Sequence, residues 1–249
     1  MDKQAFQTAC EKIIDKQRTQ NGIGTLGEKT LHAVLKLYFE PSEANHEVKI
    51  GPFVADIVTD KGIIEIQTRN FNQLRKKLAA FLEEFPVTVV YPIPHIKWLL
   101  WIDEASGTVT QKRKSPKQGR LYDAVFELYR IKPLLDHPNL RLCFVFIDLE
   151  EYRYLNGWSR DKKRGSTRCD RIPVDIVEEV TINSPADYTK FLPEVFPQPF
   201  TSKDFQKAAR TSLSAAQQTL HILHHLGIVK RVGKQRKLYL YERMEYAEM

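Results

Sequence analysis

Two acidic side chains interrupt the apolar runs of residues 53–68, and this feature most constrains how the chain folds. The runs 54–59 and 63–68 are rich in β-branched residues and are separated by Asp60-Lys61-Gly62, a pattern that predicts an antiparallel hairpin. Asp56 and Glu65 then lie on adjacent strands. Because burying a lone carboxylate costs several kcal/mol, Glu65 between two isoleucines requires a partner, and a metal ion is one candidate.

The period of two in a strand predicts which side chains share a face. Glu65 and Gln67 would point to one side of the second strand, and Ile64 and Ile66 to the other. Together with Asp56, three oxygen-bearing side chains can converge. The alternative is that the acids belong to strand edges and have only a structural role.

Apolar patterning predicts an α/β core around this hairpin. Amphipathic helices are expected near residues 3–17, 25–39 and 71–85, and strands at 46–50, 87–91, 98–102 and 141–149. Residues 87–91 and 98–102 are continuous apolar runs, which are typical of strands covered on both faces.

The order of these elements and acids resembles the PD-(D/E)XK nuclease superfamily over residues 25–102. Glu28 falls on the helix, Asp56 on a strand, and Glu65-Ile66-Gln67 on the next strand. The resemblance implies a restriction-endonuclease-like core with a mixed sheet flanked by helices. It also implies that Asp56, Glu65 and the Ile66 carbonyl bind Mg²⁺, or Mn²⁺ as a substitute, with Glu28 as an accessory acid.

The chain departs from that motif at two positions. Gln67 stands where most members have a lysine, and Ala55 stands where the motif has proline. An amide can orient a water molecule but carries no positive charge, although some members do have Glu-x-Gln. We expect Gln67 to belong to the catalytic set and Arg69, Arg75 or Lys76 to supply the missing charge.

Positive charge is concentrated in two parts of the chain, whose net charge is +7. Residues 111–171 contain 15 basic and 8 acidic side chains, and residues 200–249 contain 9 and 4. Such segments favour a polyanion, and nucleic acid is a common one, although a solvated surface has the same composition. We expect residues 159–171 to form an exposed loop. The predicted phosphate-binding residues in this region are Lys112, Arg113, Lys114, Lys162, Lys163, Arg164 and Arg168.

The C-terminal part has the pattern of two short helices followed by a hairpin. Helices are expected after Thr201 and Ser212, and strands at 228–232 and 238–241 flank a basic tip. Residues 184–242 resemble a winged helix-turn-helix domain, a class that binds DNA or, in many cases, only other proteins. The resemblance implies that Gln217 and Gln218 contact base edges and that Lys234, Arg236 and Lys237 contact phosphates.

Cysteine usage and hydropathy exclude other classes of protein. Three widely spaced cysteines do not suggest a disulfide framework, and no apolar run has the length of a membrane span or forms a signal peptide. We therefore expect a cytoplasmic protein without a membrane partner.

The sequence as a whole predicts a Mg²⁺-dependent DNA endonuclease with two domains. Residues 1–183 would form the nuclease-like domain, which hydrolyses phosphodiester bonds, and residues 184–249 a winged-helix domain that docks on double-stranded DNA. A homodimer would suit double-strand cleavage. Two alternatives remain: a catalytically inactive nuclease fold that acts as a DNA-binding regulator, and a protein-interaction module.

Overall fold

The computed structural model describes residues 1–21, 30–103, 105–156, 167–195 and 197–244. Contacts divide the chain into two compact units that alternate along the sequence. Unit 1 comprises residues 1–60, 92–119 and 145–179, and unit 2 comprises residues 61–91, 120–144 and 180–249. Each unit is a group of separate segments that contact one another, whereas the predicted domains are continuous stretches of sequence. The predicted domain boundary after residue 183 therefore stays a prediction.

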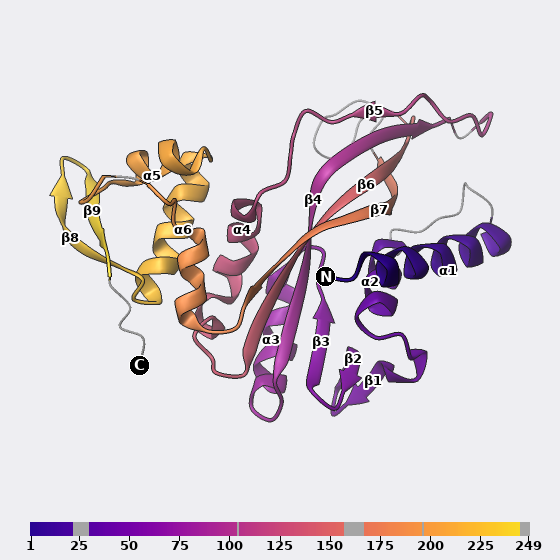
Figure 1. The fold of residues 1–249 in the computed structure, drawn as a ribbon, viewed down its shortest axis with the longest axis horizontal. Coiled ribbons are helices and arrows are strands. Elements are labelled where there is room, and N and C mark those ends of the chain that lie inside the picture. Colours follow the sequence, from indigo (N-terminus) through magenta and orange to yellow (C-terminus); the bar gives the residue numbers. More distant parts are fainter. Residues whose placement is uncertain (22–29, 104, 157–166, 196, 245–249) are drawn as a thin grey trace. The chain divides into compact units, whose positions relative to one another are not determined.

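The structure is mixed α/β with a large mixed sheet and helices beside it (Figure 1). The strand order is β1-β2-β3-β4-β6-β7, and β5 pairs with β4. The β1–β2 and β4–β5 pairs are antiparallel, and the β3–β4 pair is parallel. The strands are β1 His46–Ile50, β2 Phe53–Thr59, β3 Gly62–Ile66, β4 Val87–Ile102, β5 Arg113–Lys114, β6 Leu140–Tyr154 and β7 Thr167–Ile182.

Two strands differ from the sequence prediction. Residues 87–102 form one strand where two were expected, because the fixed φ of Pro92 and Pro94 is compatible with extended backbone. β7 begins at Thr167, so the expected loop is wrong for residues 167–171. Hydropathy missed this start because charged and polar side chains there are held by ion pairs and hydrogen bonds. Residues 157–166 lie outside the described residues.

In unit 1, the helix pair α1 (Lys3–Asn21) and α2 (Thr30–Phe39) forms a local core. Phe6 of α1 is buried and contacts Tyr38 of α2 edge-on, with ring centroids 5.5 Å apart. At the start of α2, the Thr30 hydroxyl donates a hydrogen bond to the buried carboxylate of Asp170 in β7. A buried charge therefore helps fix the first turn of α2. No described helix is long and apolar enough to cross a membrane.

In unit 2, β3 and β4 are joined by helix α3 (Phe71–Leu82) in a β-α-β arrangement. The parallel register pairs Ile63 with Val87 and Glu65 with Val89. A parallel pair requires such a crossover connection, and α3 provides it by burying Leu74, Leu78 and Phe81. This arrangement places one face of α3 next to the end of β3.

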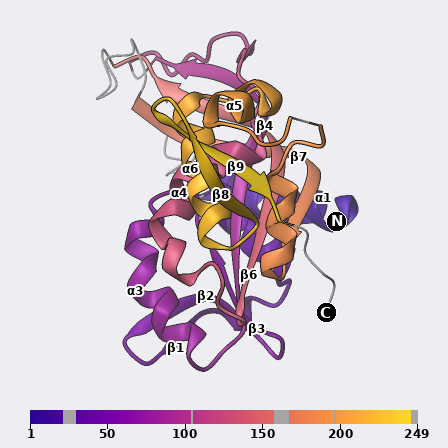
Figure 2. The ribbon, with the colours of Figure 1, turned by 90° about the vertical axis from the view of Figure 1, so that its left-hand side faces the viewer.

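The C-terminal elements of unit 2 are a short 3₁₀ helix η4 (Pro185–Phe191), helices α5 (Ser202–Ala209) and α6 (Leu213–His225), and the hairpin β8 (Val229–Gln235) and β9 (Leu238–Arg243). Figure 2 shows α5, α6 and the hairpin together. The Thr201 and Ser212 hydroxyls cap α5 and α6 by accepting hydrogen bonds from Asp204 and Ala215 N–H groups. Both predicted helices and the hairpin are present.

These elements pack on residues 120–135 of the same unit. Residues 121–134 form three short pieces, η2 (Leu121–Ala124), α4 (Val125–Leu128) and η3 (Tyr129–Leu134). The Arg120 guanidinium donates to the carbonyl of Arg210 at 2.9 Å, and the Tyr122 hydroxyl donates to the carbonyl of Phe191 at 3.1 Å. The C-terminal helices are thus tied to unit 2 by hydrogen bonds as well as by apolar packing.

Gly62→Ala is expected to lower the free energy of unfolding by roughly 2–5 kcal/mol, because strain and overpacking add. Gly62 has φ +121°, and an added Cβ would lie 2.2 Å from the Pro86 carbonyl oxygen. Gly51→Ala is the matched control, since φ there is +56° but no heavy atom of the described residues lies within 4 Å; it should cost roughly 1–2 kcal/mol. Equal losses in urea unfolding would contradict this account.

Candidate functional site

Glu65 is a buried carboxylate at the end of β3, with a lysine as its partner. The residue is 2% exposed, and the Lys77 ammonium donates a hydrogen bond to its Oε2 at 2.6 Å. Lys77 lies on α3, with its ammonium 5.7 Å from the centroid of the Phe81 ring. The sequence predicts that Glu65 needs a partner, and Lys77, from the helix of the same β-α-β arrangement, is a cation in that position.

Lys77 was not among the cations considered from sequence. Arg75 and Lys76 are exposed, because the face of α3 that packs inward is set by Leu74, Leu78 and Phe81. Lys77 follows Leu74 by three positions and precedes Phe81 by four, so it borders this inward face. That spacing is the signal from which it could have been found.

Gln67 directly follows β3. Its backbone N–H donates to the Val90 carbonyl at 2.9 Å and extends the parallel ladder by one residue. Its side-chain amide donates to the Arg69 carbonyl. Lys77, ten residues after Gln67, is the cation paired with Glu65.

Asp56 lies on β2, the strand next to β3 in the sheet order. Its side chain is 20% exposed, and one carboxylate oxygen lies 3.3 Å from Nε2 of His32 on α2. In the described part of the chain, no three His, Cys, Asp or Glu side chains form a group able to hold a metal ion. Glu28, the predicted accessory acid, lies outside the described residues.

A second buried carboxylate, Glu151 of β6, lies among four cations of unit 1. Glu151 is fully buried; Lys97 and Arg171 lie 3.3 and 3.2 Å from its Oε2, and Arg168 lies 3.6 Å away. The Arg153 Nε donates to its other oxygen at 2.8 Å. Burial raises the pKa of Glu151, but Lys97, Arg171 and Arg153 together lower it to about 2. Arg168, predicted to bind phosphate, is therefore already next to a carboxylate.

Glu151 is expected to make the stability of the protein sensitive to acid. Its pKa falls from 4.5 to about 2 on folding, so its contribution is complete above pH 4.5 and is lost as the pH falls toward 2. The contribution is roughly 3 kcal/mol. We expect the difference in unfolding free energy between the wild type and Glu151→Gln to shrink from pH 7 to pH 2. A difference independent of pH would contradict this ion-pair network.

The other predicted basic residues of unit 1 have different surroundings. The Lys112 ammonium lies 2.6 Å from Glu150 and 4.6 Å from the centroid of the Trp98 ring. Arg113 and Lys114 are exposed and form the short strand β5. Lys162, Lys163 and Arg164 lie outside the described residues.

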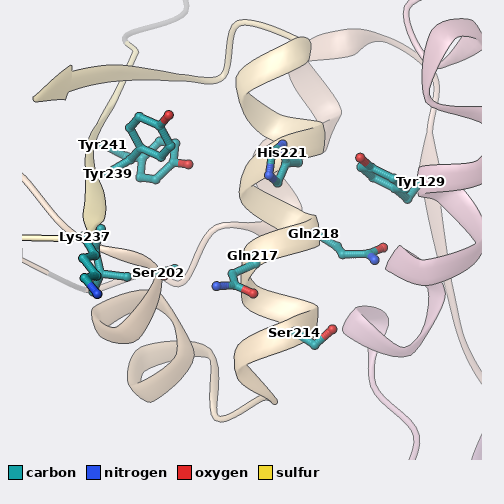
Figure 3. A pocket seen from close by; sticks show the side chains of 10 residues that line it. Tyr129, Ser202, Ser214, Gln217, Gln218, His221, Lys237, Tyr239 and Tyr241 are labelled. Atoms are coloured by element: carbon teal, nitrogen blue, oxygen red, sulfur yellow. The ribbon is translucent and has the colours of Figure 1, made fainter. Parts of the chain in front are cut away.

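The predicted base-contacting residues line a cavity of about 440 Å³ in unit 2, which we call the α6 pocket (Figure 3). Gln217 is exposed, Gln218 is half-buried, and Lys237 is at the hairpin end. The other lining residues are Tyr129, Ser202, Ser214, His221, Leu238, Tyr239 and Tyr241. Tyr129 comes from a distant part of the sequence, and no sequence pattern indicates that it lies at this pocket.

The two other cations of the hairpin lie near the pocket. The Lys234 ammonium lies 5.1 Å from the Tyr239 ring centroid, and Arg236 is exposed in the turn.

Comparison with known proteins assigns the chain to a family. Residues 29–183, more than half of the chain, match the family described as "Domain of unknown function (DUF8091)", and the chain belongs to it. A relative from Treponema pallidum (strain Nichols), described as an uncharacterized protein, is 28% identical over 223 residues. That match covers 89% of this chain and 87% of the relative. No solved structure matches the chain.

Proposed function

We propose that this protein is a metal-dependent endonuclease that hydrolyses phosphodiester bonds in DNA. The observation that carries the proposal is the buried Glu65, held by Lys77 at the end of β3, with Asp56 on the neighbouring strand β2. A buried carboxylate with a specific charge partner is a candidate functional site. The mixed sheet with the order β2-β3-β4 and helix α3 as crossover is compatible with a restriction-endonuclease-like core.

The proposed metal ligands fit a hard cation. Asp56 and Glu65 offer carboxylate oxygens and Ile66 a carbonyl, and Mg²⁺ or Mn²⁺ prefers oxygen ligands; Mg²⁺ also keeps several of its waters, so few protein ligands are needed. Glu28 would be an accessory acid. When bound, the ion would lower the pKa of a coordinated water and offset negative charge on the phosphate.

The side chains around these acids have their own roles in the proposal. Lys77 is paired with Glu65 and brings a positive charge next to it at 2.6 Å. That charge would compensate for the missing lysine at position 67, where Gln67 is left to orient water. His32, 3.3 Å from Asp56, would orient that carboxylate toward the ion.

The C-terminal elements would dock the substrate in the manner of a winged helix. Lys234, Arg236 and Lys237 are all exposed at the hairpin, as phosphate contacts require. Arg113 and Lys114 on β5 would add further phosphate contacts. Each contact releases a counterion, so the affinity for DNA should fall as the salt concentration rises.

The test is a cleavage assay on plasmid, linear duplex and single-stranded DNA, with Mg²⁺, Mn²⁺ or EDTA. We expect cleavage of at least one substrate with either metal and none in EDTA. The Glu65→Gln variant, purified in the same way, should not show this cleavage, and that result excludes a contaminating nuclease. Absence of metal-dependent cleavage from every substrate would overturn the proposal.

A second candidate is a DNA-binding regulator that has the nuclease fold without activity. It is favoured by Gln67, whose amide nitrogen is already engaged by the Arg69 carbonyl. This candidate predicts DNA binding that is unaffected by EDTA, and no cleavage. The same assay, combined with a binding measurement, separates the two functions.

A further inference from the structure

Helix α6 exposes a polar stripe. Its buried residues, which lie together on one side of the helix, are Ala215, Ala216, Thr219, Leu220, Ile222 and Leu223. Ser214, Gln217 and His221 are exposed, and Gln218 is half-buried. Ser214, Gln217, Gln218 and His221 of this stripe line the α6 pocket.

Aromatic rings border this stripe on two sides. Tyr129 of η3 lies on one side, with its ring centroid 6.2 Å from that of His221, and Tyr239 and Tyr241 of β9 lie on the other (Figure 3). Tyr129 is 40% exposed and Tyr239 is 41% exposed, so both rings are accessible. The cavity volume of about 440 Å³ is within the range of small-ligand sites, roughly 300–1,000 Å³.

The chemistry of the α6 pocket favours a planar, anionic ligand. Among the described residues that line it, none is acidic, and Lys237 contributes a positive charge. Two further cations lie on its aromatic rings: the Arg231 guanidinium is 4.1 Å from the Tyr239 centroid, and the Lys132 ammonium is 5.7 Å from the Tyr129 centroid. Ligands with a phosphate are therefore attracted, while aromatic rings offer stacking surfaces.

The pocket also offers directional hydrogen bonds. The buried Oε1 of Gln218 has no hydrogen-bond partner in the described part of the chain, and a buried acceptor without a partner is costly. Burial, and then the charges of Arg231, Lys132 and His224, lower the pKa of His221. The imidazole is thus neutral at pH 7 and can both donate and accept. Amides and a neutral imidazole suit the edge of a nucleobase.

We propose that the α6 pocket binds an unpaired nucleotide of a nucleic-acid strand. The base stacks on Tyr129 or Tyr239, its edge contacts Gln217 or Gln218, and its phosphate contacts Lys237. The choice of nucleic acid rests on the proposed function. A duplex keeps its bases paired and stacked, so only a single strand, a tail or an extruded base can enter. The preferred substrate then has single-stranded character.

The test measures binding in EDTA, where cleavage is absent, by fluorescence anisotropy of labelled DNA. The probes are a blunt duplex, the same duplex with a single-stranded thymidine tail, and the tail alone, with thymidine monophosphate as competitor. We expect the tail to tighten binding. Tyr129→Leu and Tyr239→Leu should each weaken binding of the tailed duplex by roughly 5- to 150-fold, the loss of one stacked base. Tyr129→Phe and Tyr239→Phe should bind like the wild type.

Phe126→Leu is the matched control, since Phe126 is 40% exposed on α4 but does not line the pocket; it should leave binding unchanged. Tail-independent binding, or leucine variants that bind as well as the wild type, would overturn the inference. Competition by the mononucleotide at concentrations near those of the tail would indicate a free nucleotide as ligand and contradict strand binding. A protein that never cleaves yet binds tails through these tyrosines would overturn only the proposed function.

Discussion

Glu65→Gln and Asp56→Asn are each expected to lower metal-dependent cleavage by at least about 10³-fold. A bound metal supplies several kcal/mol of stabilisation for transition-state charge, and each 1.36 kcal/mol corresponds to a tenfold change in rate. An amide has almost the shape of the carboxylate but binds a hard cation weakly. The cleavage rate is measured on the DNA substrate that the wild type cleaves fastest with Mg²⁺ or Mn²⁺. Binding of the same DNA in EDTA should be nearly the same for the variants and the wild type.

Two nearby acids serve as matched controls for these variants. Asp60 is exposed in the turn between β2 and β3, and Glu84 is exposed after α3. Asp60→Asn and Glu84→Gln each remove the same charge and should retain the wild-type rate. If Glu65→Gln and Asp56→Asn remain folded and cleave like these controls, the two acids do not form the metal site.

Lys77→Met is expected to lower the free energy of unfolding by about 3–5 kcal/mol, the usual cost of leaving a buried charge without its partner. Glu65 is 2% exposed, so water cannot replace the ammonium that donates to it at 2.6 Å. Methionine keeps most of the length of the lysine side chain without its charge. Urea unfolding without metal measures the loss, and the exposed neighbour Lys76 provides the control, because Lys76→Met should change stability by no more than about 0.5 kcal/mol.

A double-mutant cycle separates the ion pair from packing. In the Glu65→Gln background, Lys77→Met should cost much less than it does in the wild type, since no buried charge remains to be compensated. The same loss in both backgrounds would show that the aliphatic part of Lys77 is what stabilises the protein. Lys77→Met should also slow cleavage at temperatures where it is fully folded; an unchanged rate there would restrict Lys77 to a structural role.

The secondary structure around the candidate site could be predicted because its signals are local. Alternation and turn residues predict the hairpin of β2 and β3, and the apolar spacing of Leu74, Leu78 and Phe81 predicts α3. The same reasoning predicts that Glu65 needs a cation. The spacing also shows that Lys77 borders the inward face of α3. It does not show that Lys77 reaches Glu65, because that depends on how α3 packs against the sheet.

Other features depend on partners that are distant in sequence. The start of β7 at Thr167 is rich in charge, and it is a strand because Arg168 and Arg171 reach Glu151 on β6. Tyr129 contacts His221 across more than ninety residues of sequence. Neither contact produces a periodic pattern in the sequence. The ion-pair network and the α6 pocket therefore could not be predicted from the sequence.

The central claim, a metal ion bound by Asp56 and Glu65, is tested most directly by anomalous diffraction from crystals grown with Mn²⁺. We predict one anomalous peak within about 2.5 Å of a carboxylate oxygen of each residue, and no such peak in Glu65→Gln crystals. Wild-type crystals at saturating Mn²⁺ in which neither carboxylate contacts an ion would contradict the account.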